Sequence, residues 1–231
     1  MLSKQILYSR KASLLRLARK MGGEAWLLRL ARTFYHLRLD GLDHLPQQGG
    51  CLIPFNHVAL YVDALVYLVI RSRRPDVHLF TWRLAQGEVT GLLEAAFGTP
   101  AQGPALLFAH KRQGQSAADL LRARQVLLQG GAVALAPEGE PSWDGRLQHP
   151  LAPGAAWLAL RTACLVAPVV SLGGYDIQPV WQVEKIRLTG RVTIRGGQPF
   201  RLCAAPLDAV APAQLGDASQ RIWQALAALL A

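Results

Sequence analysis

Residues 51–63 read CLIPFNHVALYVD, an apolar run that ends in a polar pair and then continues in a helical pattern. A short apolar run bounded by turns indicates a buried strand, here Cys51–Phe55. Asn56 and His57 follow this strand directly, and Asp63 comes at the start of the predicted helix. Sites in α/β proteins are built at the carboxyl ends of strands. A histidine there, with a carboxylate one to two helical turns away, has the parts of a base held by an orienting acid.

Strand and helix patterns alternate along the rest of the chain, without an internal repeat or a domain linker. This alternation predicts an α/β fold with a largely parallel central sheet flanked by helices. The predicted strands are His36–Asp40, Cys51–Phe55, Val77–Trp82, Ala105–Ala109, Ala132–Ala136, Cys164–Val170 and Ile186–Arg195. The predicted helices are Ala64–Arg71, Glu88–Phe97, Ala117–Gln129, Ala155–Arg161 and Ser219–Leu230.

The N-terminal segment is strongly basic. Residues 1–40 hold nine Lys or Arg against two acidic residues, which is most of the net charge of +10 on 231 residues. Apolar residues recur at helical spacing on both sides of Gly22-Gly23, so two amphipathic helices are predicted over residues 1–35, before an α/β domain of residues 36–231. Such helices bind anionic membrane surfaces, although a packed surface helix with solvated charges has the same pattern. We expect a peripheral protein at the cytoplasmic face of a membrane.

Composition and cysteine content argue against several other classes of protein. No stretch reaches the roughly 18 uncharged apolar residues of a spanning helix, and Lys or Arg interrupts the N-terminus too often for a secretory signal. Cys51, Cys164 and Cys203 lie far apart in apolar sequence, which indicates buried free thiols. Because the basic charge is concentrated in aliphatic helices, without the interleaved aromatics of nucleic-acid binders, a lipid partner is favoured and no nucleic acid is expected.

A second motif follows the predicted strand at 132–136, and it reads APEGEPSWDG at residues 136–145. With this motif, the chain resembles the glycerolipid acyltransferases of the lysophosphatidate acyltransferase (PlsC-like) family. That family has Asn-His-x4-Asp, a basic block, Phe-Pro-Glu-Gly-Thr-Arg-Ser and Val-Pro-Val, in this order. The matching residues, within a resemblance that covers roughly residues 36–200, are Asn56, His57 and Asp63; Lys111 and Arg112; Pro137, Glu138, Gly139 and Ser142; and Pro168, Val169 and Val170.

The resemblance implies an O-acyltransferase that moves a fatty acyl group from acyl-CoA or acyl-carrier protein to a lysophospholipid hydroxyl. The first expected acceptor is 1-acylglycerol-3-phosphate, which would become phosphatidate, without a cofactor or a metal. His57 is then the general base and Asp63 the acid that orients it. The substrate-binding residues implied by the resemblance are Lys111 and Arg112 at an acceptor phosphate, Glu138 and Gly139 at the acceptor wall, and Asn56, which also suits the turn.

Two departures from the family pattern bear on these expectations. Five residues separate His57 from Asp63 where the family has four, and a six-residue step leaves two side chains about 120° apart on a regular helix. We therefore expect His57 in the turn before the helix and Asp63 reaching back from its first turn. Glu140-Pro141 stands where the family has Thr-Arg, which removes a cation near the expected phosphate site. Another lyso-lipid acceptor, or a lipid-binding homologue without activity, remains an alternative.

Other enzyme classes lack their motifs. A serine hydrolase would also handle acyl groups, but no Gly-x-Ser-x-Gly sequence occurs. The sequence has neither a Walker loop nor a dinucleotide-binding fingerprint. Its His, Cys and Asp residues form no cluster with the spacing of metal ligands. An acyltransferase is thus the function that the sequence favours.

Overall fold

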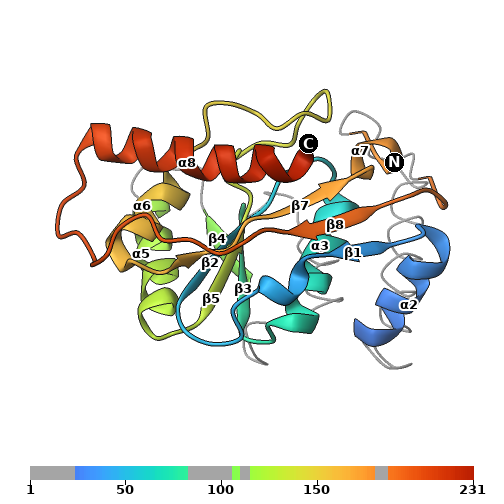
Figure 1. The fold of residues 1–231 in the computed structure, drawn as a ribbon, viewed down its shortest axis with the longest axis horizontal. Coiled ribbons are helices and arrows are strands. Elements are labelled where there is room, and N and C mark those ends of the chain that lie inside the picture. The colour runs from blue at the N-terminus through green and yellow to red at the C-terminus, as the bar shows by residue number, and fades with distance from the viewer. Residues whose placement is uncertain (1–23, 83–105, 110–114, 180–186) are drawn as a thin grey trace.

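The computed structural model describes residues 24–82, 106–109, 115–179 and 187–231, which form an α/β fold (Figure 1). In these residues a five-stranded sheet has the order β4-β3-β5-β2-β6, and all of its neighbouring strands are parallel. A three-stranded sheet has the order β1-β8-β7, with β1 parallel and β7 antiparallel to β8. The strands are β1 (Arg38–Asp40), β2 (Cys51–Pro54), β3 (Val77–Trp82), β4 (Leu106–Ala109), β5 (Ala132–Leu135), β6 (Leu165–Val166), β7 (Val169–Leu172) and β8 (Thr193–Gly196).

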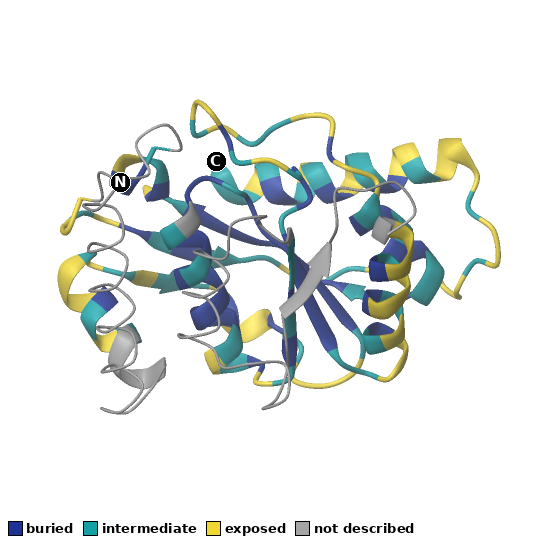
Figure 2. Ribbon diagram, turned by 180° about the vertical axis from the view of Figure 1, so that it is seen from behind, coloured by how far each residue is buried: buried dark blue, intermediate teal, exposed yellow. Residues whose placement is uncertain are grey.

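Helices cover both faces of the five-stranded sheet. Alternate residues of a strand point to opposite faces, so Cys51 and Ile53 of β2 pack in the core beside α3, whereas Leu52 packs with α5, α6 and α8. Figure 2 shows the central strands as buried and the outer helix faces as exposed. The helices are α2 (Glu24–Phe34), the short 3-10 helix η1 (Leu42–His44), α3 (Leu60–Arg73), α5 (Gln115–Leu128), α6 (Gly154–Thr162), α7 (Gly174–Ile177) and α8 (Pro212–Leu230).

The predicted α/β class with a parallel sheet is confirmed, but the prediction of one strand over Cys164–Val170 was wrong. This segment forms β6 and β7, which belong to different sheets. The Ala167 N–H still donates to the Leu52 carbonyl in the first sheet, at 2.9 Å. Pro168 has no N–H to continue that ladder, and the chain crosses to the second sheet. The predicted strand over Ile186–Arg195 was also too long, because in the described part of this segment, from residue 187 on, the strand begins at Thr193 and ends at Gly196. The predicted helix Glu88–Phe97 lies outside the described residues.

Helix α2 is the second of the two predicted N-terminal helices, and the first lies outside the described residues. Ala31 is buried in the core that includes α3, and Leu28 and Tyr35 pack against the same core. Part of the apolar face of α2 is therefore covered by protein. Within the described residues, no helix combines the length and the hydropathy needed to cross a membrane.

The free thiols predicted from the sequence are present. Cys51 and Cys164 are buried and Cys203 is half-buried, and all three are unpaired. Burial is the main reason why the pKa of Cys51 is raised to about 12. A thiol with so high a pKa stays protonated and unreactive at neutral pH.

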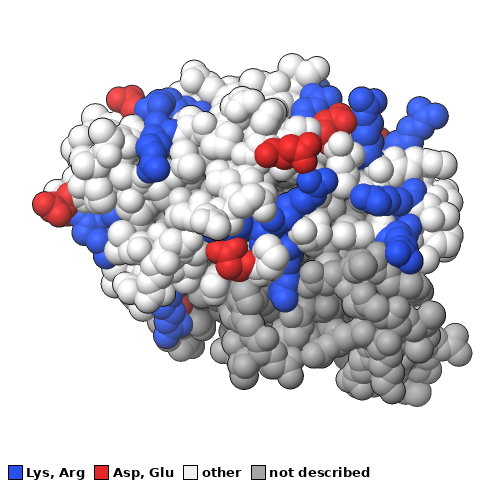
Figure 3. Space-filling view, turned by 60° about the horizontal axis from the view of Figure 1, so that its bottom comes forward, with Lys and Arg blue, Asp and Glu red and all other residues white. Residues whose placement is uncertain are grey.

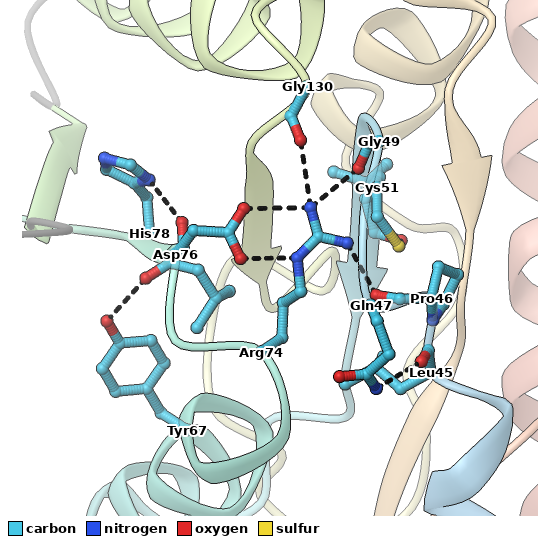
Figure 4. Close-up of polar contacts among 12 residues, drawn as sticks. Leu45, Pro46, Gln47, Gly49, Cys51, Tyr67, Arg74, Asp76, His78 and Gly130 are labelled. Carbon is cyan, nitrogen blue, oxygen red and sulfur yellow. Dashed lines mark hydrogen bonds and ion pairs between the residues drawn. The ribbon is translucent and has the colours of Figure 1, made fainter.

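A buried arginine joins the beginnings of three neighbouring strands (Figure 4). Arg74, only 1% exposed, follows α3 and pairs with Asp76 through two hydrogen bonds, of 2.5 and 2.9 Å. It also donates to the carbonyl oxygens of Pro46, Gly49 and Gly130, at 2.6 to 3.0 Å. Gly49, Asp76 and Gly130 lie just before β2, β3 and β5. This network therefore fixes the edge of the sheet opposite to the carboxyl ends of the strands.

Candidate active site

His57 and Asp63 form a hydrogen-bonded pair after β2. His57 lies in the turn between β2 and α3, and Asp63 lies in the first turn of α3. The His57 Nδ1 atom is 2.5 Å from Asp63 Oδ2, and the two side chains are 16% and 11% exposed. The predicted placement of His57 in the turn and of Asp63 in the first turn of the helix is confirmed. The turn accommodates the one residue by which this spacing exceeds that of the family motif. A carboxylate at Nδ1 favours the tautomer in which Nδ1 carries the proton and Nε2 keeps a lone pair.

Glu138 holds the His57 turn from the neighbouring strand. It follows β5, which pairs with β2, so the two strands bring both residues to one edge of the sheet. Glu138 Oε1 accepts a hydrogen bond from the His57 backbone N–H at 2.5 Å, and Oε2 accepts one from the Gln148 N–H at 2.8 Å. Because both carboxylate oxygens bind backbone groups of the protein, the geometry supports a positioning role for Glu138.

The loop that follows Glu138 closes on the same turn. The Ser142 N–H donates to the His57 carbonyl at 2.7 Å, and the buried Ser142 hydroxyl donates to the Arg146 carbonyl at 2.7 Å. Gly139 has a φ of +79°, a left-handed conformation that glycine adopts without strain. Both backbone groups of His57 are thus bound to residues 138–142.

Asn56 connects the His57 turn to the second sheet. Its side-chain Nδ2 donates to the Ser171 carbonyl at 3.0 Å, and its Oδ1 accepts from the Ser171 N–H at 2.7 Å. The residue is buried, and Ser171 belongs to β7. The amide is therefore engaged inside the protein, and no direct contact of Asn56 with substrate is proposed.

The start of α3 is held by a residue that the sequence did not indicate. The N-cap residue, Ala59, has no side chain that can cap the helix. Instead, the buried Gln178, which follows α7, accepts a hydrogen bond from the Tyr61 N–H at 3.2 Å. No sequence spacing connects Gln178 with α3, since only the fold brings α7 to this helix.

The charges around His57 are negative among the described residues. Burial alone would lower the pKa of His57, but the hydrogen bond and charge of Asp63 outweigh it, and Glu138 and Glu140 act in the same direction. The pKa of His57 is therefore raised above its usual value of about 6.5. Burial raises the pKa of Glu138, against the two backbone N–H groups that it binds. The imidazole at residue 57 is thus a stronger base than a free one.

The structure describes some of the predicted site residues and not others. His57, Asp63, Asn56, Glu138 and Gly139 come together at the carboxyl ends of β2 and β5. Lys111 and Arg112 lie outside the described residues. Ser171 and Gln178 complete the support of the turn and were not among the predicted residues.

Comparison with known proteins identifies the family of this chain. The sequence model of the family described as Acyltransferase matches residues 36–172, which is more than half of the chain and includes the whole His57 turn. The chain belongs to this acyltransferase family.

A solved structure extends the similarity to nearly the whole chain. It is the 1-acyl-sn-glycerophosphate (LPA) acyltransferase PlsC from Thermotoga maritima, with a TM-score of 0.57 and 16% sequence identity. The match covers 97% of this chain and 82% of that one, and at this identity it demonstrates the shared fold. No curated protein matches the sequence.

Proposed function

We propose that this acyltransferase moves a fatty acyl group from a thioester, either acyl-CoA or acyl-carrier protein, onto the hydroxyl of a lysophospholipid. The observation that carries the proposal is the 2.5 Å contact between His57 Nδ1 and Asp63 Oδ2 after β2. It leaves Nε2 as the atom that accepts a proton, and a general base of this kind contributes roughly 10²–10⁴-fold to a rate.

The proposed reaction is a direct transfer. His57 Nε2 takes the proton of the acceptor hydroxyl while that oxygen attacks the thioester carbonyl. Asp63 stabilises the imidazolium that forms. The tetrahedral intermediate then expels the thiolate, which takes the proton from His57, so that the products are an ester and a free thiol. Backbone N–H groups at the start of α3, other than that of Tyr61, are the proposed partners of the oxyanion.

The acceptor that we favour is 1-acylglycerol-3-phosphate, with Lys111 and Arg112 as its phosphate-binding residues. This choice rests on family membership and on the acceptor named for the Thermotoga maritima protein. Another lyso-lipid is the second candidate, because Glu140 contributes negative charge near His57 at the position of the Arg-containing family motif. The proposed setting is the cytoplasmic face of a membrane, with residues 1–35 in contact with anionic lipid.

A radiolabelled acyl donor and a panel of lyso-lipids test this function. We expect wild-type protein to form a diacyl product from at least one lysophospholipid, and His57→Ala to lose that activity. A matched control is His78→Ala, which changes a histidine at the start of β3 whose ring contacts the Asp76 carbonyl. An active His57→Ala protein would remove the general-base assignment. Activity of the wild type on an acceptor other than lysophosphatidate would support the second candidate.

A further inference from the structure

The end of α2 and the loop before β8 form one corner of the molecule. The Gly190 N–H donates to the Phe34 carbonyl at 3.2 Å, and the Val192 N–H donates to the Tyr35 carbonyl at 3.0 Å. The Arg38 N–H donates back to the Val192 carbonyl at 2.9 Å. Figures 1 and 2 both place this loop beside the end of α2, and Figure 2 colours much of the pair as exposed. Two segments far apart in the sequence thus share a surface.

Two large apolar side chains are exposed at this corner. Leu188 is 75% exposed, the highest value among the large apolar residues that the structure describes, and Phe34 is 47% exposed. A single exposed apolar residue is common on protein surfaces. Whether two such residues on hydrogen-bonded segments indicate a binding surface depends on the residues that surround them.

Those surroundings are basic. Arg187 and Arg191 flank Leu188 in the sequence, and Arg29 and Arg32 lie on α2 before Phe34; all four are exposed. Within the described part of the chain, none of these four forms an ion pair, while the nearby Arg38 is paired with Asp40 at 2.9 Å. On the face seen in Figure 3, Lys and Arg are more numerous than Asp and Glu.

We propose that this corner docks on an anionic phospholipid surface. The docking corner consists of Phe34 and Leu188, with Arg29, Arg32, Arg187 and Arg191 around them. Apolar side chains that enter the lipid interface, surrounded by basic side chains that face its phosphates, are the chemistry of interfacial binding. The proposal deepens the function proposed above, because a lysophospholipid acceptor resides in such a surface.

The docking corner is connected to the His57 turn through α7. The Arg187 N–H donates to the Ile177 carbonyl at the end of α7, at 3.0 Å. At the other end of α7, Gly174 packs so closely on Val58 and Val62 that an added Cβ would lie within 3 Å of both. Val58 directly follows His57. Helix α7 therefore contacts both the docking corner and the segment that follows His57, so that lipid held at the corner would lie one short helix away from the site.

Docking of this kind is independent of the covered face of α2. Ala31 and Leu28 pack on the domain, while Phe34 and the arginines lie on the exposed side. The C-terminal half of the chain thus contributes a lipid contact of its own, in addition to the basic residues 1–35.

Sedimentation of the full chain with vesicles tests the proposal. The variant is Arg187→Gln/Leu188→Ser, and the control is Leu121→Ser/Arg122→Gln, which removes an equally adjacent pair from the exposed side of α5. Leu121 is 56% exposed, and α5 lies toward the other end of the fold (Figure 1). The vesicles are phosphatidylcholine alone and phosphatidylcholine mixed with phosphatidylglycerol. Circular dichroism and the thermal midpoint check that each variant is folded.

We expect the corner variant to bind the mixed vesicles about tenfold more weakly than the wild type, since one arginine near an anionic surface and one inserted leucine are lost. The control should bind as the wild type does. Equal binding of the corner variant and the wild type, or no preference of the wild type for anionic vesicles, would overturn the proposal. Since binding is measured without substrate, a failure of acyl transfer is a separate result that concerns only the proposed function.

Discussion

The Glu138 carboxylate binds the His57 backbone N–H at 2.5 Å, across two neighbouring parallel strands. Its second oxygen binds the Gln148 N–H, and the Ser142 N–H binds the His57 carbonyl. The backbone N–H and the backbone carbonyl of His57 are therefore both hydrogen-bonded, which fixes the turn that presents the imidazole. Positioning of the base thus depends on a residue that binds the backbone of His57, while the ring itself binds Asp63.

Glu138→Gln should lower kcat by roughly 10- to 100-fold, because an amide offers only one acceptor oxygen for two N–H groups and misplaces the reactive ring. Glu140→Gln removes a similar charge without either of these hydrogen bonds, and its kcat at the optimal pH should change little. The measurement is steady-state kinetics on both variants. Equal losses in the two would show that charge, and not the hydrogen bonds, is what matters.

Asp63→Asn should lower kcat by roughly 10²–10⁴-fold with little change in KM, because the amide no longer selects the tautomer with a proton on Nδ1. A general loss of structure would also lower the apparent kcat by lowering the active fraction, so the circular dichroism spectrum and the thermal midpoint of Asp63→Asn are measured as well and should match those of the wild type. The expectation fails if Asp63→Asn retains wild-type kcat.

The activity should fall with decreasing pH along a limb centred above about pH 6.5, since the pKa of His57 is raised and its protonated form cannot accept a proton. Glu140→Gln should move this limb to lower pH, because one of the charges that raise the pKa is removed. Asp217→Asn on the exposed surface of α8 is the control, and its profile should match that of the wild type. A limb that stays in place in Glu140→Gln would show that Glu140 does not act on His57.

Asn56→Ala should reduce the free energy of unfolding by about 1–3 kcal/mol for each backbone group of Ser171 that it leaves buried and unpaired. Ser171→Ala is the matched control, because it keeps both backbone groups and loses only a hydroxyl contact of 3.4 Å. Urea titrations of both variants give the difference. A larger loss in the control would contradict the assigned role of the Asn56 amide.

Arg74→Met should destabilise the protein by about 1–3 kcal/mol for each carbonyl group before the strands that it leaves buried and unpaired, because the guanidinium binds the carbonyls of three residues. Its neighbour Arg73 pairs with Asp43 on the surface, at 2.7 Å, so Arg73→Met should cost less than about 1 kcal/mol. Urea unfolding measures both values. Similar costs for the two variants would mean that burial of the Arg74 network adds no stability.

The sequence predicted those parts of the fold that depend on local pattern. Periodicity and flanking turns predicted the strand Cys51–Phe55 and the helix that follows it. The angular spacing of side chains on a helix predicted how His57 and Asp63 meet. The resemblance to a family supplied the roles, because an isolated His and Asp at this spacing have little specificity.

Long-range relationships were not predictable from the same patterns. Nothing local shows that Asn56 will bond to Ser171 or that Gln178 will hold the start of α3, since both contacts depend on how distant segments pack. The break between β6 and β7 has a signal in the sequence, because Pro168 has no N–H to donate to a strand ladder. The short spacing of Arg74 and Asp76 is a signal of an ion pair, but only the structure shows that the arginine is buried.

The Arg74 network and the His57 turn lie at opposite ends of the same strands. Substitutions at the Arg74 end of the strands would mainly affect whether the chain folds. Substitutions at the His57 end would mainly affect the proposed chemistry. Substitutions near the His57 turn, at residues such as Glu140 and Pro141, can therefore leave the Arg74 network intact.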